Sequence, residues 1–325
     1  MCALQVGTAR AVSGEMTRGT LTLGYGFDAP IEAPVVIAAG RNPGPTLWVQ
    51  ALIHGTEVGG TIAIARFLKG LDLAALRGTI VGLPVVNPLA FRAWARNVPV
   101  DGFNQNRVFP GSPGGSFSEQ AAHTLLGTAM ATADAILDLH SGGDRSFVPH
   151  YALYWADGSA ASNEAGRLAR AAGTQDIWQT TDHWLTGAMF TLATQRGKPA
   201  LIVECGGGAA VPEGDLAKLQ ASLTGVGQAL GIVPGEAPRR PSYRVMGESD
   251  LLMSGRGGLF VAACKPGDVL QAGQEVGRVV DVLDNVQQVI TAPYGPAYIA
   301  SIRRTYHALN SGEQVAEIIH VVEGA

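Results

Sequence analysis

The stretch 34–57 reads PVVIAAGRNPGPTLWVQALIHGTE. It holds two strand-like apolar runs, 35–39 and 47–53, and the Asn-Pro-Gly-Pro sequence between them is typical of a turn. The second run stops at a His-Gly pair, and residues 60–71 then carry apolar side chains at helical spacing, which predicts a helix. A strand that ends in polar residues and leads into a helix is typical of an α/β protein.

The same alternation continues as far as residue 230. The segment 87–115 has several Pro and Gly residues and no clean period, which predicts a long loop. Strands that alternate with helices need crossover connections, so we predict an α/β catalytic domain over 1–235, with a mainly parallel mixed sheet covered by helices. The further strands we expect are 79–86, 135–140, 151–155 and 200–205, and the further helices are 118–131, 161–172 and 215–230.

The pattern changes after a proline-rich linker near residue 234. Short runs separated by Gly and Pro predict a small all-β barrel-sandwich domain over 236–325. Residues 267–300 resemble half of the barrel of biotinyl and lipoyl carriers, but no lysine occurs at 281–286, where the hairpin tip of a carrier needs one. We therefore expect a structural or lid role, and a biotin or lipoyl mass shift on the protein would reverse this interpretation.

The composition excludes several classes of protein. The 325 residues carry a net charge of −4, which argues against a nucleic-acid-binding surface. No apolar run is long enough to span a membrane, and residues 1–10 do not resemble a signal peptide, so we expect a cytoplasmic protein without a membrane partner. The cysteines Cys2, Cys205 and Cys264 are far apart and odd in number, which argues against a disulfide scaffold or a thiolate zinc cluster. The expected partner is a small molecule, and the sequence leaves a homo-oligomer open.

Three candidate metal ligands follow predicted strands. His54 and Glu57 come after the strand 47–53, and His140 ends the strand 135–140. Ligands of α/β sheets bind at the carboxyl ends of strands, and catalytic zinc takes three protein ligands such as His nitrogen and Glu oxygen. Taken alone, each residue is more often a hydrogen-bonded histidine or a glutamate in the first turn of a helix, and it is the combination at neighbouring strand ends that favours a metal site.

Two further carboxylates lie near these strand ends. Asp138 shares a strand face with His140, so it either orients that imidazole by a hydrogen bond or caps backbone N–H groups. Glu204 closes an apolar strand, and a carboxylate there is costly to bury unless it is paired or catalytic. Glu204 is therefore a candidate general base for a metal-bound water, with a cap of the next turn as the alternative.

The densest polar segment is 96–111, RNVPVDGFNQNRVFPG. Arg107 offers a planar fork that suits a substrate carboxylate, and Asn106 can donate beside it. Arg96 is a candidate for stabilising a developing oxyanion. The alternative is a loop held together by its own Asn and Arg hydrogen bonds.

The sequence contains four motifs in this order: HGTE at 54–57, NQNRVFPG at 104–111, DLHSGG at 138–143 and VECGG at 203–207. Together they resemble the succinylglutamate desuccinylase/aspartoacylase family of the zinc carboxypeptidase superfamily. The resemblance is nearest to the bacterial deacetylase-like members of that family. The resemblance implies one Zn²⁺ per chain, held by His54, Glu57 and His140. It implies Glu204 as general base and acid, the pair Asn106–Arg107 on a substrate carboxylate, and Arg96 at the scissile carbonyl, with Arg92 as a competitor.

The activity that the resemblance implies is metal-assisted hydrolysis of the amide bond of an N-acyl amino acid or a related small N-acyl amine. Two alternatives remain: a zinc carboxypeptidase acting on small peptides, and a catalytically degenerate binding protein. Manganese, cobalt or nickel could occupy the same ligands. The C-terminal domain of the family can supply a tyrosine to the substrate, and Tyr294, Tyr298 and Tyr306 are the candidates.

Overall fold

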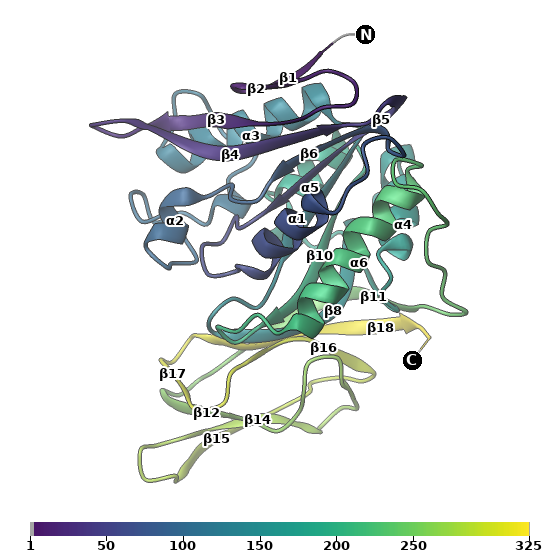
Figure 1. Ribbon diagram of the computed structural model, residues 1–325. Coiled ribbons are helices and arrows are strands. Elements are labelled where there is room, and N and C mark those ends of the chain that lie inside the picture. Colours follow the sequence, from purple (N-terminus) through teal and green to yellow (C-terminus); the bar gives the residue numbers. More distant parts are fainter. Residues whose placement is uncertain (1–2, 325) are drawn as a thin grey trace.

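The computed structural model describes residues 3–324. These residues form a mixed α/β fold around a large twelve-stranded sheet (Figure 1). From one edge to the other, its strands are β3 (Met16–Tyr25), β4 (Pro30–Ala39), β6 (Arg77–Leu83), β5 (Asn42–Ala51), β7 (Ala135–His140), β10 (Ala200–Gly207), β8 (Ser146–Trp155), β9 (Asp176–Thr180), β11 (Arg244–Met253), β18 (Gln314–Glu323), β16 (Ala297–Arg303) and β13 (Val269–Leu270).

Parallel pairing is confined to the centre of this sheet. Strand β5 is parallel to β6 and β7, β7 is parallel to β10, and β9 is parallel to β8 and β11. Over the described residues the other neighbours are antiparallel, including β10 with β8 and the β3–β4 hairpin. The prediction of a mainly parallel sheet is therefore correct only for the centre. Antiparallel strands extend the sheet at both ends, β8 runs against β10, and β16 also pairs antiparallel with β8.

Helices cover both faces of the sheet. Successive residues of β5 point to opposite faces, so Leu47 packs among residues of α1, α4 and α6, whereas Trp48 packs among residues of α3 and α5. Figure 1 shows α1, α4 and α6 together on one face. The helices are α1 (Gly59–Lys69), α2 (Pro88–Arg92), α3 (Phe117–Thr132), α4 (Ala160–Ala171), α5 (Met189–Gln195) and α6 (Glu213–Ala229), with the 3₁₀ turns η1 (Gln105–Arg107) and η2 (His183–Leu185).

The helix boundaries follow local sequence signals. Ser116 begins α3 with a capping box, in which its side chain accepts from the Glu119 N–H and its own N–H donates to the Glu119 carboxylate. The segment 87–115, predicted as one loop, contains α2 and η1. Both are too short to show a helical period in the sequence.

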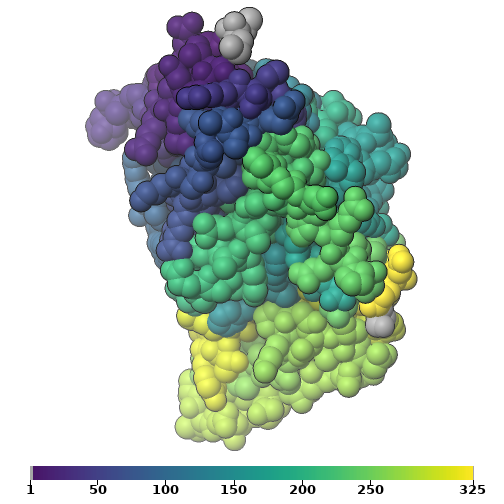
Figure 2. Space-filling model, turned by 45° about the vertical axis from the view of Figure 1, so that its right-hand side comes forward, coloured from purple at the N-terminus to yellow at the C-terminus, as the bar shows by residue number. Residues whose placement is uncertain are grey.

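The C-terminal residues are all β, and their strands divide between two sheets. Strands β11, β18 and β16 continue the large sheet across the expected boundary at 235/236. A second sheet, with its own apolar core around Phe260, lies below them in Figure 1. Figure 2 shows these residues gathered at one end of the molecule. The second sheet is formed by β12 (Gly258–Ala262), β14 (Glu275–Val280), β15 (Val286–Thr291) and β17 (His307–Leu309), and a separate N-terminal hairpin by β1 (Leu4–Val6) and β2 (Ala9–Ala11).

Two of the cysteines fall within the described residues, and Cys205 and Cys264 are both free thiols. Cys2 lies outside the described residues. None of the helices between residues 3 and 324 combines the length and the apolar composition that crossing a membrane requires.

Candidate active site

The carboxyl ends of the three adjacent strands β5, β7 and β10 bring the candidate residues together. His54 and Glu57 lie in the turn between β5 and α1, His140 is the last residue of β7, and Glu204 lies in β10. His140 and Glu204 are directly paired in the parallel ladder. The sheet topology therefore places four side chains from distant parts of the sequence at one edge.

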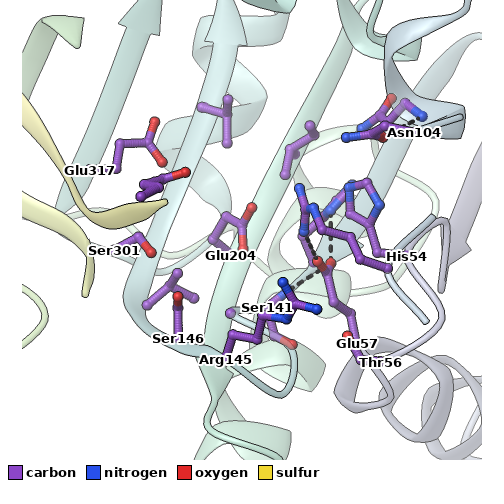
Figure 3. Close-up of a pocket in the computed structure, with 18 of the residues that line it drawn as sticks. His54, Thr56, Glu57, Asn104, Ser141, Arg145, Ser146, Glu204, Ser301 and Glu317 are labelled. Atoms are coloured by element: carbon purple, nitrogen blue, oxygen red, sulfur yellow. Dashed lines mark hydrogen bonds and ion pairs between the residues drawn. The ribbon is translucent and has the colours of Figure 1, made fainter. Parts of the chain in front are cut away.

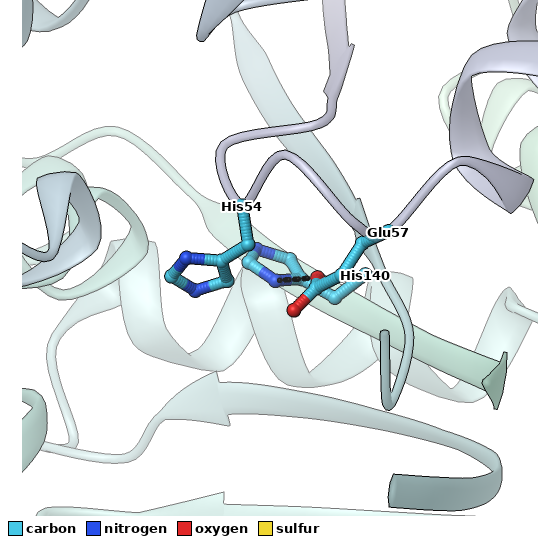
Figure 4. Close-up of side chains that lie close together, drawn as sticks. All are labelled: His54, Glu57 and His140. Atoms are coloured by element: carbon cyan, nitrogen blue, oxygen red, sulfur yellow. Dashed lines mark ion pairs between the residues drawn. The ribbon is translucent and has the colours of Figure 1, made fainter. Parts of the chain in front are cut away.

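His54, Glu57 and His140 form a compact, buried group (Figure 4). One nitrogen or oxygen ligand atom from each residue lies within 4.8 Å of those of the other two. The His140 Nδ1 atom is 3.0 Å from the Glu57 Oε2 atom, and the two imidazole rings are 5.4 Å apart between centroids. The buried Nδ1 atom of His54 has no hydrogen-bond partner among the described residues. Two imidazoles and one carboxylate at this spacing are a donor set that suits a divalent transition metal.

A series of contacts between buried side chains extends from His140 through Asp138 and Gln50 to Trp48. The His140 Nε2 atom is 3.2 Å from the Asp138 Oδ2 atom, and that oxygen accepts a hydrogen bond from the Gln50 amide at 3.0 Å. The Gln50 oxygen in turn accepts from the Trp48 indole N–H at 2.9 Å. Of the two sequence alternatives for Asp138, the geometry favours orientation of the imidazole, because the Asp138 side chain faces His140 and Gln50.

Burial and charge act differently on the two imidazoles. Burial is the main reason that the pKa of His54 lies well below its usual value, and the positive charge of Arg96 lowers it further. Burial also acts to lower the pKa of His140, but the adjacent carboxylates Asp138 and Glu57 outweigh it and raise that pKa well above its usual value. A neutral imidazole such as His54 is the form that ligates a metal.

The turn that carries His54 and Glu57 is held by close backbone packing. The Gly55 N–H donates to the Ala95 carbonyl at 3.0 Å, and a Cβ on Gly55 would come within 2.1 Å of the Ala90 carbonyl carbon. Only glycine permits this approach. The Asn87 side chain donates to the Ile53 carbonyl and caps α2 by accepting from the Ala90 N–H. Helix α2 thus fixes the end of β5.

Arg96 and Arg92 are the two candidates for the arginine at the scissile carbonyl, and only Arg96 lies at the pocket. The Arg96 Nη1 atom is 2.9 Å from the Glu57 Oε1 atom, and Arg96 lines the pocket, whereas Arg92 is exposed and does not. Arg96 remains about half exposed at the pocket rim. The arrangement leaves Arg96 within reach of a molecule that binds beside Glu57.

Asn106 and Arg107 lie on the η1 turn and face the same pocket. Asn106 is buried, and its side-chain oxygen accepts from the Met189 N–H at 3.1 Å. The Arg107 guanidinium lies 4.9 Å from the centre of the Trp184 ring and donates to the Asn106 carbonyl at 2.7 Å. Burial is the main reason that its pKa falls to about 10, so Arg107 remains a cation at neutral pH.

Glu204 has a buried carboxylate oxygen, Oε2, without a hydrogen-bond partner among the described residues. Burial is the main cause that raises the pKa of this carboxyl to about 8. Neighbouring Cys205 points away, and burial raises the pKa of its thiol to about 12, which makes it an inert thiol. Gly207, three residues after Glu204, packs closely against the backbone of β8: a Cβ on Gly207 would lie 2.3 Å from the Ser146 carbonyl oxygen.

One cavity with a volume of about 420 Å³ is lined by the candidate metal ligands, the candidate base and the candidate substrate-binding residues (Figure 3). These are His54, Glu57, His140, Glu204, Arg96, Asn106 and Arg107. That volume lies near the lower end of the range for small-molecule sites. The wall opposite His54 comes from the C-terminal strands. Its residues are Leu251, Ser301, Arg303, Gln314 and Glu317.

The tyrosines expected from the C-terminal part do not line this cavity. Tyr298 is buried and donates to Asp176 at 2.8 Å, Tyr294 stacks on His320, and Tyr306 is exposed. Tyr151, from β8, lines the cavity instead.

The sequence interpretation missed Glu317. It is a carboxylate within the apolar strand VAEIIHVV, the same signal that drew attention to Glu204. The signal was available, but the C-terminal strands were expected to form a separate domain.

The family model for the succinylglutamate desuccinylase/aspartoacylase catalytic domain matches residues 43–229. The N-alpha-acetyl-L-2,4-diaminobutyric acid deacetylase of Halomonas elongata is 28% identical over 295 residues, which cover 89% of this chain and 86% of the relative. The product-bound structure of an ectoine utilization protein from Ruegeria pomeroyi has a TM-score of 0.86 at 23% identity, covering 98% and 100% of the two chains. An aspartoacylase family protein from Mesorhizobium loti has a TM-score of 0.81 at 27% identity, covering 99% and 100%.

Proposed function

Because the chain belongs to the succinylglutamate desuccinylase/aspartoacylase family, and is thus an amidohydrolase, we propose that it is a zinc-dependent deacylase of small N-acyl amino acids. One observation carries the proposal. The group His54, Glu57 and His140 lies in a cavity of about 420 Å³ together with Glu204, whose Oε2 atom has no hydrogen-bond partner in the described part of the chain. The similarity to a diaminobutyric acid deacetylase makes N-acetylated amino acids the first substrates to test.

His54, Glu57 and His140 would hold one zinc ion. Two nitrogen donors and one oxygen donor match the ligand set of catalytic zinc, which leaves a further position for water or substrate. When bound, the ion would lower the pKa of a water toward about 7 and polarise the scissile carbonyl. The contact between the Asp138 carboxylate and the His140 Nε2 atom would fix the orientation of His140 toward Glu57.

Glu204 would move the proton. Its Oε2 atom accepts a proton from the attacking water while the water oxygen bonds to the acyl carbon. The carbon–nitrogen bond then breaks, and Glu204 returns the proton to the leaving nitrogen. One water is consumed, and the products are a carboxylate and an amine. Glu204 lies opposite His140 in the β7–β10 ladder, and this position supports its role as the proton carrier beside the proposed metal ligands.

Arginines would position the substrate. The Arg107 guanidinium, held over Trp184, would pair with the substrate carboxylate, and Asn106 would donate beside it. Arg96 at the rim would donate to the carbonyl oxygen as negative charge develops there. These contacts fix the amide over Glu204.

The cavity favours an N-acyl amino acid over a peptide. A carboxypeptidase would use the same ligands and base, but here the C-terminal strands form one wall of a small cavity. Comparing the hydrolysis of a blocked dipeptide with that of N-acetyl amino acids tests this choice.

The complete set of ligands and base also speaks against a degenerate binding protein. We place the reaction in the cytoplasm.

Metal content is the first test. We expect about one zinc per chain in protein purified without chelator, and loss of that zinc in His140→Ala. His123→Ala, at an exposed histidine of α3, is the matched control and should keep the metal. Hydrolysis of a panel of N-acyl amino acids should follow the metal content. A wild-type protein that binds no zinc even when zinc is offered would contradict the proposal.

A further inference from the structure

The cavity contains one carboxylate that the proposed reaction does not use. Glu317 lies on β18, with Leu251 of β11 and Ser301 of β16 as its ladder neighbours. All three residues line the cavity. Figure 3 shows the Glu317 carboxylate on the wall opposite His54 and directed into the cavity.

Glu317 has no charge partner among residues 3–324. Its buried Oε1 atom has no hydrogen-bond partner, and none of the described cations lies within 4.0 Å of its carboxylate. Arg107 and Arg96 are close enough to act on it electrostatically, but Arg107 donates to the Asn106 carbonyl and Arg96 pairs with Glu57. A buried carboxylate without a partner is costly, so a ligand cation is the partner that would remove the cost.

We propose that Glu317 binds a positively charged amino group on the amine half of the substrate, so that the enzyme selects short N-acyl diamino acids over neutral or acidic N-acyl amino acids. The inference rests on the proposed function. In one cavity, Arg107 would take the substrate carboxylate and Glu317 the side-chain ammonium. An ammonium offers three donors, and its pairing with a buried carboxylate is a strong, charge-assisted hydrogen bond.

A pair of nearly isosteric substrates tests this selection. N-acetylnorvaline has a methyl group where Nα-acetyl-2,4-diaminobutyrate has the ammonium. We expect wild-type kcat/KM to favour the cationic substrate by about 10–100-fold, as one charge-assisted hydrogen bond allows. Glu317→Gln should lower that ratio about tenfold or more, and Glu317→Asp should restore part of it. Glu323→Gln, at an exposed glutamate of the same strand, should leave the ratio unchanged.

The alternative role of Glu317 is to position Arg107, since the two groups interact electrostatically. In that case Glu317→Gln would weaken both substrates equally, and the unchanged ratio would overturn the proposal. A wild-type ratio near one would do the same while leaving the deacylase function intact.

Binding of the free amino acids separates the inference from the proposed function. By calorimetry, 2,4-diaminobutyrate should bind more tightly than norvaline, and Glu317→Gln should remove the difference. If neither acetylated compound is hydrolysed but this difference is found, the deacylase proposal fails and the role of Glu317 stands. If the two free amino acids bind equally or not at all, the role of Glu317 is overturned.

Discussion

Glu204 lies directly opposite His140 in the parallel ladder between β7 and β10. This single register relationship joins a candidate metal ligand to a candidate proton carrier across 64 residues of sequence. Two residues before His140 on β7, Asp138 is the ladder partner of Gln50 on the other neighbouring strand, β5. The side chains of Asp138 and Gln50 are hydrogen-bonded at 3.0 Å. Strand pairing in the sheet therefore positions both the candidate site residues and the side chains that contact His140.

Replacing Glu204 by Gln should abolish most activity without removing the metal. The amide is nearly isosteric but cannot accept the proton of the attacking water, so we expect kcat to fall by about 10²–10⁴-fold. Zinc content by elemental analysis should remain at the wild-type level, because the ligands His54, Glu57 and His140 are unchanged. Retained activity in this variant would remove Glu204 from the proton-transfer role.

Asp138→Asn tests the support of the metal ligands. The amide keeps the size of the side chain but loses the charge that faces His140. We expect about 10–100-fold weaker zinc affinity, the typical effect of removing a partner that orients a ligating histidine. Competition with a chromophoric chelator measures the affinity, and circular dichroism checks the fold. An unchanged affinity would mean that Asp138 serves only the packing of Gln50 and Trp48.

Sequence reasoning found the central strands and the residues at their ends, because buried strands and polar strand ends leave a strong local signal. It did not find that β11, β16 and β18 continue the large sheet, because pairing between distant strands leaves no local signature. Glu317 was overlooked as a result, since its meaning depends on which residues face it across the cavity.

Arg107→Lys tests recognition of the substrate carboxylate. Lysine keeps the charge, but it lacks the planar fork and the stacking over Trp184. We expect kcat/KM for an N-acetyl amino acid to fall by about 10–100-fold, mainly through a higher KM. The same substrates with a carboxamide in place of the carboxylate provide the control, because wild type and variant should differ little on them. An equal loss on both series would show that Arg107 supports the loop rather than the substrate.

Glu317→Gln should stabilise the ligand-free protein, and more so at neutral than at acidic pH. Burial is the main cause that raises the pKa of Glu317 to about 7, while Arg107 and Arg96 lower it and Asp182 raises it. The folded protein therefore binds this proton more tightly than the unfolded chain does. Wild-type stability is lost as the pH rises from the unfolded value near 4.5 to about 7.

The size of that loss is of the order of 1–3 kcal/mol, since each pKa unit corresponds to about 1.4 kcal/mol. Glutamine carries no such cost, so the melting temperature of the variant should exceed that of wild type at pH 7.5, and the two should converge near pH 4.5. Thermal unfolding at equal zinc content measures the difference, with Glu323→Gln as the control that follows wild type at every pH. A Glu317→Gln protein that is less stable than wild type at pH 7.5 would show that the carboxylate has a structural partner in the folded chain, and the unsatisfied charge invoked for substrate selection would not exist.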